Sequence, residues 1–226
     1  MQPQNYALII PQRCRELLES YYSDEKSKPN GNEVTLLLAL ATPAILFPLQ
    51  KLSQPDDASV GEFPGTVSPQ TEEKFKKFLA MGKGLQSLTP VYRSVSTARM
   101  IRCKAGWCCE KSPIKGELPQ EIREQLSDEG SLDNFRKTEN QSIVSVFRNA
   151  LAHGGVIYAD DNHAQKDFGQ IDRIVFVSRW KKNNVVCGLN FLSLSPDDFR
   201  LFVVDWCEML GRQFPEILRA PFQIAA

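Results

Sequence analysis

The residues best suited to chemistry lie in one segment, Phe147 to Gly155, which reads F-R-N-A-L-A-H-G-G. Histidine titrates near neutral pH and can act as a general acid or base. Arginine can bind phosphate oxygens through paired hydrogen bonds, and asparagine can orient a phosphate or a ribose. This set suits RNA, which carries its own nucleophile, the 2′-hydroxyl beside the scissile phosphate. Arg148, Asn149 and His153 are therefore the candidate catalytic residues, and we expect neither a metal nor another cofactor.

The segment ends a predicted helix, Leu132 to Ala152, which the following Gly-Gly pair stops. An α-helix advances about 100° per residue, so Asn149 and His153 share a face, whereas Arg148 and His153 differ by about 140°. Both can border one groove if a second helix packs alongside, for example the same helix of a second subunit. On spacing alone, the alternative is a surface arginine and a histidine that caps the helix.

The composition indicates an ordinary soluble globular protein, with 42% hydrophobic and 24% charged residues among 226. Two prolines, Pro43 and Pro48, interrupt the longest apolar run, Val34 to Leu49, so no membrane span is expected. The N-terminus lacks the features of a signal peptide. We therefore expect a cytoplasmic protein whose six cysteines are reduced.

Charge is unevenly distributed along a chain whose net charge is zero. Ten basic residues and one acidic residue lie between Lys74 and Lys115, and an acidic stretch follows from Glu117 to Asp133. The basic stretch can form a positive surface for phosphates, or the two stretches can be solvated faces that neutralise each other. Aromatic residues within it can stack on bases, although aromatic side chains are more often core. These residues are Phe75, Tyr92 and Trp107.

Cysteine and histidine positions give little support for a metal. Cys103, Cys108 and Cys109 do not form the two spaced pairs that structural zinc usually requires. His163 lies in a polar segment with three aspartates, where it can bind a divalent cation or act as a second acid–base group. We favour a solvated loop histidine.

Hydrophobic periodicity predicts several helices. They are Tyr6 to Tyr22 (regular from Pro11), Asn32 to Leu52, Thr71 to Met81, Pro119 to Gln125 (ended by Gly130), Leu132 to Ala152 and Phe199 to Phe214. Asn32 to Leu52 is apolar on nearly every face, which predicts a core or interface position, and Pro43 should kink or divide it. The sequence Ser195-Pro196-Asp197-Asp198 is typical of a helix start.

Alternation predicts a β-hairpin from strands Arg173 to Trp180 and Val185 to Leu194, joined at Lys181 to Asn184. Pro90 to Ile101 is compatible with either strand or helix, and Cys103 to Pro119 is expected to be irregular. Three aromatic residues are expected to be structural, namely Trp180, Trp206 and Phe202.

The segment Arg148-Asn149-Ala150-Leu151-Ala152-His153-Gly154 resembles the R-x4–6-H motif of HEPN domains, which lies at the end of a long helix. The proline-broken apolar segment Leu36 to Leu49 also looks like the second helix of some prokaryotic members. The resemblance implies a helical bundle, a two-fold dimer and one composite site. Active members are metal-independent endoribonucleases of toxin–antitoxin, phage-defence and RNA-processing systems. In this chain Arg148 and His153 would be the catalytic pair, with Asn149 in support.

Two departures from the family pattern qualify what the resemblance implies. HEPN toxins controlled by a nucleotidyltransferase antitoxin often carry tyrosine two residues after the histidine, where this chain has Gly155, and the nearest tyrosine is Tyr158. The hairpin is not part of the minimal bundle, and some members only bind RNA, nucleotides or proteins. A coincidental motif in an interaction protein is a further alternative.

Together these observations predict a mainly α fold: a HEPN-like helical bundle with an added C-terminal β-hairpin and final helix, in a single domain over residues 1–226. The expected partners are an RNA substrate, a second copy of the chain and an antitoxin or regulatory protein.

Overall fold

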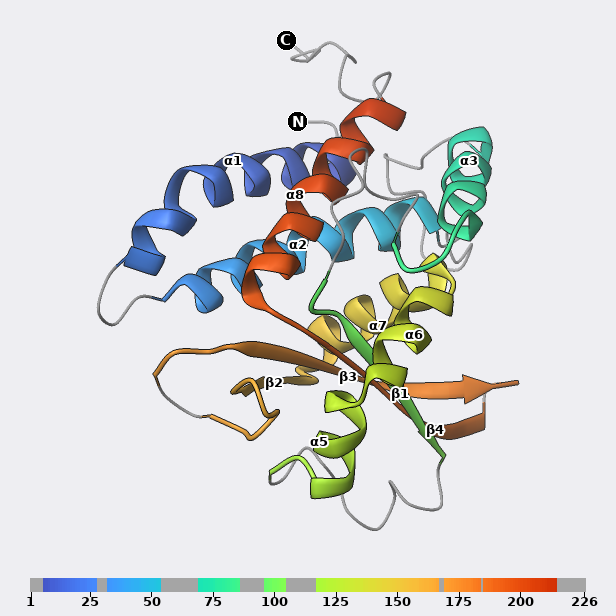
Figure 1. Ribbon diagram of the computed structural model, residues 1–226. Helices are drawn as coiled ribbons and strands as arrows, with labels where there is room; N and C mark the ends of the chain where they lie inside the picture. The colour runs from blue at the N-terminus through green and yellow to red at the C-terminus, as the bar shows by residue number, and fades with distance from the viewer. Residues whose placement is uncertain are drawn as a thin grey trace, which may run out of the picture. The chain divides into compact units, whose positions relative to one another are not determined.

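The computed structural model describes residues 6–27, 32–53, 69–85, 96–104, 117–166, 169–183 and 185–214. Their contacts divide the chain into two compact units. The helical unit contains α1, α2, α3 and the part of α8 from Val203 onward; the sheet unit contains the described elements between Gly82 and Phe202. Figure 1 shows these elements, coloured from blue to red along the chain. That the chain is a single domain remains a prediction, as does its arrangement as a HEPN-like bundle.

The helical unit is built from α1 (Tyr6–Ser27), α2 (Glu33–Ser53) and α3 (Pro69–Ala80). α1 packs against α2, and α2 contacts α3. α1 begins before Pro11, contrary to the prediction, because proline so near a helix start removes a single backbone hydrogen bond. The predicted loop between α2 and α3 lies outside the described residues.

α2 continues as one helix through Pro43 and Pro48, so Pro43 does not divide it; that Pro43 kinks the helix stays a prediction. Pro48 has no N–H with which to reach the carbonyl of Ala44, four residues earlier. The indole Nε1 of Trp206 donates to that carbonyl instead, at 3.0 Å. A side chain from α8 thus satisfies the acceptor that the proline leaves free, which helps to explain why the helix tolerates it.

By length and composition alone, Glu33–Gln50 of α2 could cross a membrane. The two prolines therefore do not exclude it as a candidate membrane span, contrary to the expectation from the sequence. One such helix is a weak indication, because the core helix of a soluble protein passes the same test. Leu37, Ala41 and Ile45 of α2 are fully buried. No membrane protein is indicated.

The sheet unit holds four antiparallel strands in the order β1-β4-β3-β2. Their bounds are β1 Arg99–Lys104, β2 Val156–Ala159, β3 Arg173–Lys182 and β4 Val185–Leu194. The predicted β3–β4 hairpin is confirmed. β1 begins in the segment Pro90 to Ile101, which was compatible with strand or helix, and β2 was not predicted. These two strands extend the hairpin on its two sides.

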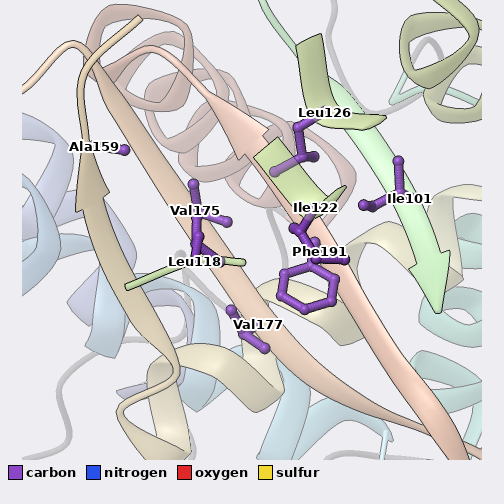
Figure 2. Close-up of a cluster of buried hydrophobic side chains, with 8 residues drawn as sticks. All are labelled: Ile101, Leu118, Ile122, Leu126, Ala159, Val175, Val177 and Phe191. Carbon is purple, nitrogen blue, oxygen red and sulfur yellow. The ribbon is translucent and has the colours of Figure 1, made fainter. Parts of the chain in front are cut away.

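Helices cover the sheet. One face receives α5 (Gln120–Ser127): Ile122 and Leu126 pack with Val175 and Phe191 of the inner strands (Figure 2). On the other face, the ring of Phe176 meets other aromatic rings, from α7 (Asn140–His153) and α8 (Pro196–Gln213). Residues 174–178 of β3 and 190–194 of β4 are buried without interruption, as expected for strands that are covered on both faces.

The predicted helix Leu132 to Ala152 is two helices, α6 (Glu129–Lys137) and α7. Tertiary hydrogen bonds stabilise the break: Gly84 N donates to the Thr138 carbonyl at 2.9 Å, and Leu85 N donates to Asn140 Oδ1 at 2.7 Å. Asn140 is fully buried. The segment that makes these bonds lies about 55 residues earlier, so helical periodicity could not reveal the break.

The final helix starts as predicted. Pro196 is its first residue, and Asp198 N donates to the Ser195 hydroxyl at 3.2 Å. Asp198 also holds the segment before β1, because its Oδ2 accepts from Thr97 N at 2.8 Å and from Thr97 Oγ1 at 2.6 Å.

Candidate active site on α7

The inner face of α7 fixes its position in the sheet unit. Phe147 and Ala150 are fully buried. The ring of Phe147 lies edge-on to Phe176 at a centroid distance of 4.9 Å and stacks on Phe202 at 4.9 Å. With one face anchored in this way, Arg148, Asn149 and His153 are more exposed than the residues that face the core.

The structure brings two of the three predicted site residues into contact. Arg148 Nη1 donates to Asn149 Oδ1 at 2.9 Å, and both side chains are half-buried. This bond orients the guanidinium and leaves its other N–H groups available to an anion. His153 is exposed in the last turn of α7, and its ring has no hydrogen-bond partner among the described residues. No hydrogen bond joins Arg148 to His153 in the described part of a single chain.

The Gly-Gly stop after His153 is confirmed and has a specific geometry. Gly154 caps α7 in the left-handed region at φ 68°, and Gly155 N donates to the Ala150 carbonyl at 2.8 Å. Val177 N of β3 donates to the Gly155 carbonyl at 2.7 Å. A Cβ at Gly155 would lie 2.3 Å from the Val177 carbonyl oxygen, so no side chain fits there without backbone movement. The chain therefore has no room for tyrosine at this position.

The prediction of a solvated His163 was wrong, because this histidine is buried. Its Nε2 lies 2.9 Å from the Ser193 hydroxyl of β4, and its Nδ1 lies 3.3 Å from the Ser127 hydroxyl of α5. Burial, and then the positive charges of Arg173 and Arg99, lower the pKa of His163 from 6.5 to about 4. The neutral ring therefore joins a helix to the sheet.

The polar segment around His163 is folded on itself. Asp160 Oδ1 accepts from the backbone N–H groups of Asn162 and Ala164, each at 2.9 Å. Asp160 is thus occupied in forming the turn. Across the described ranges, no group of three or more His, Cys, Asp or Glu side chains could hold a metal ion. Cys108 and Cys109 lie outside the described residues.

The basic stretch contributes residues to both units. Lys74, Lys76 and Lys77 belong to the helical unit; Lys83, Arg99, Arg102 and Lys104 belong to the sheet unit. Phe75 is fully buried, so it cannot stack on a base; Tyr92 and Trp107, with the remaining basic residues Arg93, Lys111 and Lys115, lie outside the described residues. Trp206 and Phe202 are buried as predicted. Trp180 is half-exposed beside Arg102, a pair that the linear sequence did not suggest.

Comparison with protein families gives a match to the family described as HEPN pEK499 p136 over residues 1–216. The chain belongs to this HEPN family. No curated protein matches the chain. No solved structure matches it either.

Proposed function

We propose that this protein is a metal-independent endoribonuclease of the toxin or phage-defence type. It cleaves RNA at a composite site formed where the α7 helices of two subunits meet. The observation that carries the proposal is the arrangement at the end of α7: a guanidinium oriented by Asn149, and an exposed imidazole one turn further on. Membership of a HEPN family supports it.

The proposed reaction is an in-line transesterification. The ribose 2′-oxygen forms a bond to phosphorus while the bond from phosphorus to the 5′-oxygen breaks. His153 transfers protons between these oxygens, and Arg148 binds the phosphate and supports its added negative charge. The products are a 2′,3′-cyclic phosphate end and a 5′-hydroxyl end. No oxidant, reductant or metal is needed for this balance.

The proposal includes a second subunit because Arg148 and His153 of one chain form no hydrogen bond with each other. Two residues five apart on a helix point about 140° apart, so a groove between paired helices can receive both. The further partner we propose is an antitoxin or regulatory protein in the cytoplasm. Gly155 argues against one that modifies a tyrosine at that position, since no side chain fits there.

A non-catalytic HEPN-like module that binds RNA, a nucleotide or a protein is the second candidate. It is favoured by the half-buried Arg148, whose bond to Asn149 also suits a structural role within one chain.

The test is cleavage of RNA in EDTA by the wild type, Arg148→Ala and His153→Ala, with analysis of product ends. Arg136→Ala is the matched control, because this arginine is exposed on α6 of the same unit. We expect cyclic phosphate ends from the wild type and the control, and none from the two site variants. Equal cleavage by all four proteins would contradict the assignment; no cleavage by any would favour the binding module.

The composite arrangement has its own test. Arg148→Ala and His153→Ala should each be inactive alone, but a mixed dimer contains one intact Arg148 and one intact His153 in different subunits. We expect activity to return when the two variants are unfolded, mixed and refolded together. The absence of recovery would contradict a site in which Arg148 acts with His153 of the other subunit.

A further inference from the structure

At the end of the sheet where β3 turns into β4 (Figure 1), three strands hold an exposed cation–aromatic pair. The guanidinium of Arg102 on β1 lies 4.6 Å from the ring centroid of Trp180 on β3. Arg102 Nε also donates to Asn190 Oδ1 of β4 at 2.9 Å. Arg102 is exposed and Trp180 is half-exposed, so the pair is both fixed in place and accessible.

Two backbone features, a register shift and a close approach at a glycine, distinguish this end of the sheet. The β3–β4 register shifts between Trp180 and Lys181, and such a bulge changes the direction of the side chains around it. A Cβ at Gly188 would lie 1.8 Å from the Cys103 carbonyl oxygen, so only glycine lets β4 approach β1 this closely. These two features bring residues of β1 and β3 together across β4.

The same end of the sheet carries positive charge that no carboxylate of the described residues pairs with. Its basic residues are Arg102, Lys104, Arg179, Lys181 and Lys182, all exposed. Segments 102–104, 178–183 and 185–190 contain no Asp or Glu, and none of these five residues forms an ion pair within the described chain. Helical lysines differ: Lys76 and Lys137 each pair with a carboxylate four residues earlier.

This surface begins where α7 ends. The bond from Val177 N to the Gly155 carbonyl extends the β2–β3 ladder by one residue and places the end of α7 at the edge of β3. On β3, Trp180 lies on the same face as Phe176, which packs against α7. Val177 and Trp180 are about 10 Å apart along the strand, which one RNA strand can span.

We propose that this end of the sheet binds single-stranded RNA, with a base stacked on the Arg102–Trp180 pair and phosphates on Lys104, Lys181 and Lys182. The inference rests on the proposed function, for which it supplies a substrate-holding surface beside α7. Every base has a flat face that stacks on an aromatic ring or a guanidinium, whereas the bases of a duplex are already stacked. A surface for anionic lipid needs the charges but not the stacking pair, so the pair favours single-stranded RNA.

The experiment measures binding of a fluorescein-labelled, 12-nucleotide single-stranded RNA by anisotropy. All proteins carry His153→Ala so that the probe is not cut. Trp180→Ala should weaken binding about tenfold through loss of stacking, and Trp180→Phe should weaken it less. Lys181→Gln with Lys182→Gln should lower the slope of log affinity against log salt by about 1.4, since each phosphate contact to a single strand contributes about 0.7. Lys137→Gln, an exposed lysine already paired on α6, is the control and should bind like the parent.

Unchanged affinity in the tryptophan and lysine variants would overturn the inference. So would tighter binding to the matching duplex or to anionic phosphatidylserine vesicles, and so would no RNA binding at all. If Trp180→Ala unfolds, the lysine pair decides, because both lysines are exposed. A protein that binds RNA through this surface without cleaving it would refute the nuclease and leave the inference standing. A nuclease whose affinity for RNA is unchanged when these residues are substituted would support the proposed function and refute the inference.

Discussion

The buried side chain of His163 should make stability depend on pH within a defined window. In the unfolded chain its pKa returns to about 6.5. In the folded protein, burial and then the charges of Arg173 and Arg99 hold it at about 4, and the carboxylates of Asp160 and Asp161 only partly offset them. The unfolded state therefore takes up a proton first as the pH falls.

The sign and the size of the pH effect on stability follow from the difference between the pKa of His163 in the folded and in the unfolded state. Above pH 6.5 the ring is neutral in both states, so His163 contributes no pH dependence. Between 6.5 and about 4 each unit of pH lowers the free energy of unfolding by up to about 1.4 kcal/mol, for a total of about 3 kcal/mol. Below pH 4 both states are protonated and the contribution levels off.

The assay is urea unfolding at several values between pH 4 and 7.5, for the wild type and His163→Gln. Glutamine keeps polar atoms for Ser127 and Ser193 but does not titrate. We expect the wild type to lose about 3 kcal/mol more than the variant across the window. NMR gives a direct check, because the chain has two histidines and the His153 signal is identified by its loss in His153→Ala. Parallel stability curves, or a His163 signal that titrates near 6.5, would refute the reasoning.

Three further expectations concern α7 and its surroundings. Gly155→Ala should destabilise the protein by more than about 2 kcal/mol, because its Cβ would meet the Val177 carbonyl. Gly154→Ala has nothing within 4 Å of its Cβ and should cost about 1 kcal/mol, because its backbone is left-handed. Thermal melts of the two variants compare these effects. Phe147→Ala should cost about 3–5 kcal/mol in chemical denaturation, since the ring is fully buried among aromatic neighbours. His153→Ala should change the free energy of unfolding by less than about 0.5 kcal/mol, so a loss of cleavage in that variant would report chemistry and not unfolding.

Local signals in the sequence were sufficient for some elements. Turn residues and alternation predicted the β3–β4 hairpin, and Ser195 with Pro196 predicted the start of α8. Gly154 and Gly155 predicted the end of α7. In each case the residues that determine the structure are close together in the chain, so a short window contains the physical cause.

The missed elements depend on distant partners. β2 has only four residues, and pairing with β3 makes it a strand. The break between α6 and α7 depends on bonds to Gly84 and Leu85, and the burial of His163 on hydroxyl groups from α5 and β4. None of these partners is visible in a local pattern, and a polar sequence around a histidine looks the same whether or not the ring folds inward.

The β-hairpin has a direct bearing on the candidate active site, although it lies outside a minimal helical bundle. Phe176 of β3 packs against Phe147 on the inner face of α7, and Val177 N holds the Gly155 carbonyl just after His153. The hairpin therefore fixes both the rotation of α7 about its axis and the position of its last turn. Under the proposed function, Arg148 and His153 act together only if α7 presents both at a groove, so the sheet would help to position them. The Arg102–Trp180 pair at the end of the same strands then gives the sheet a second role in the proposed binding of RNA.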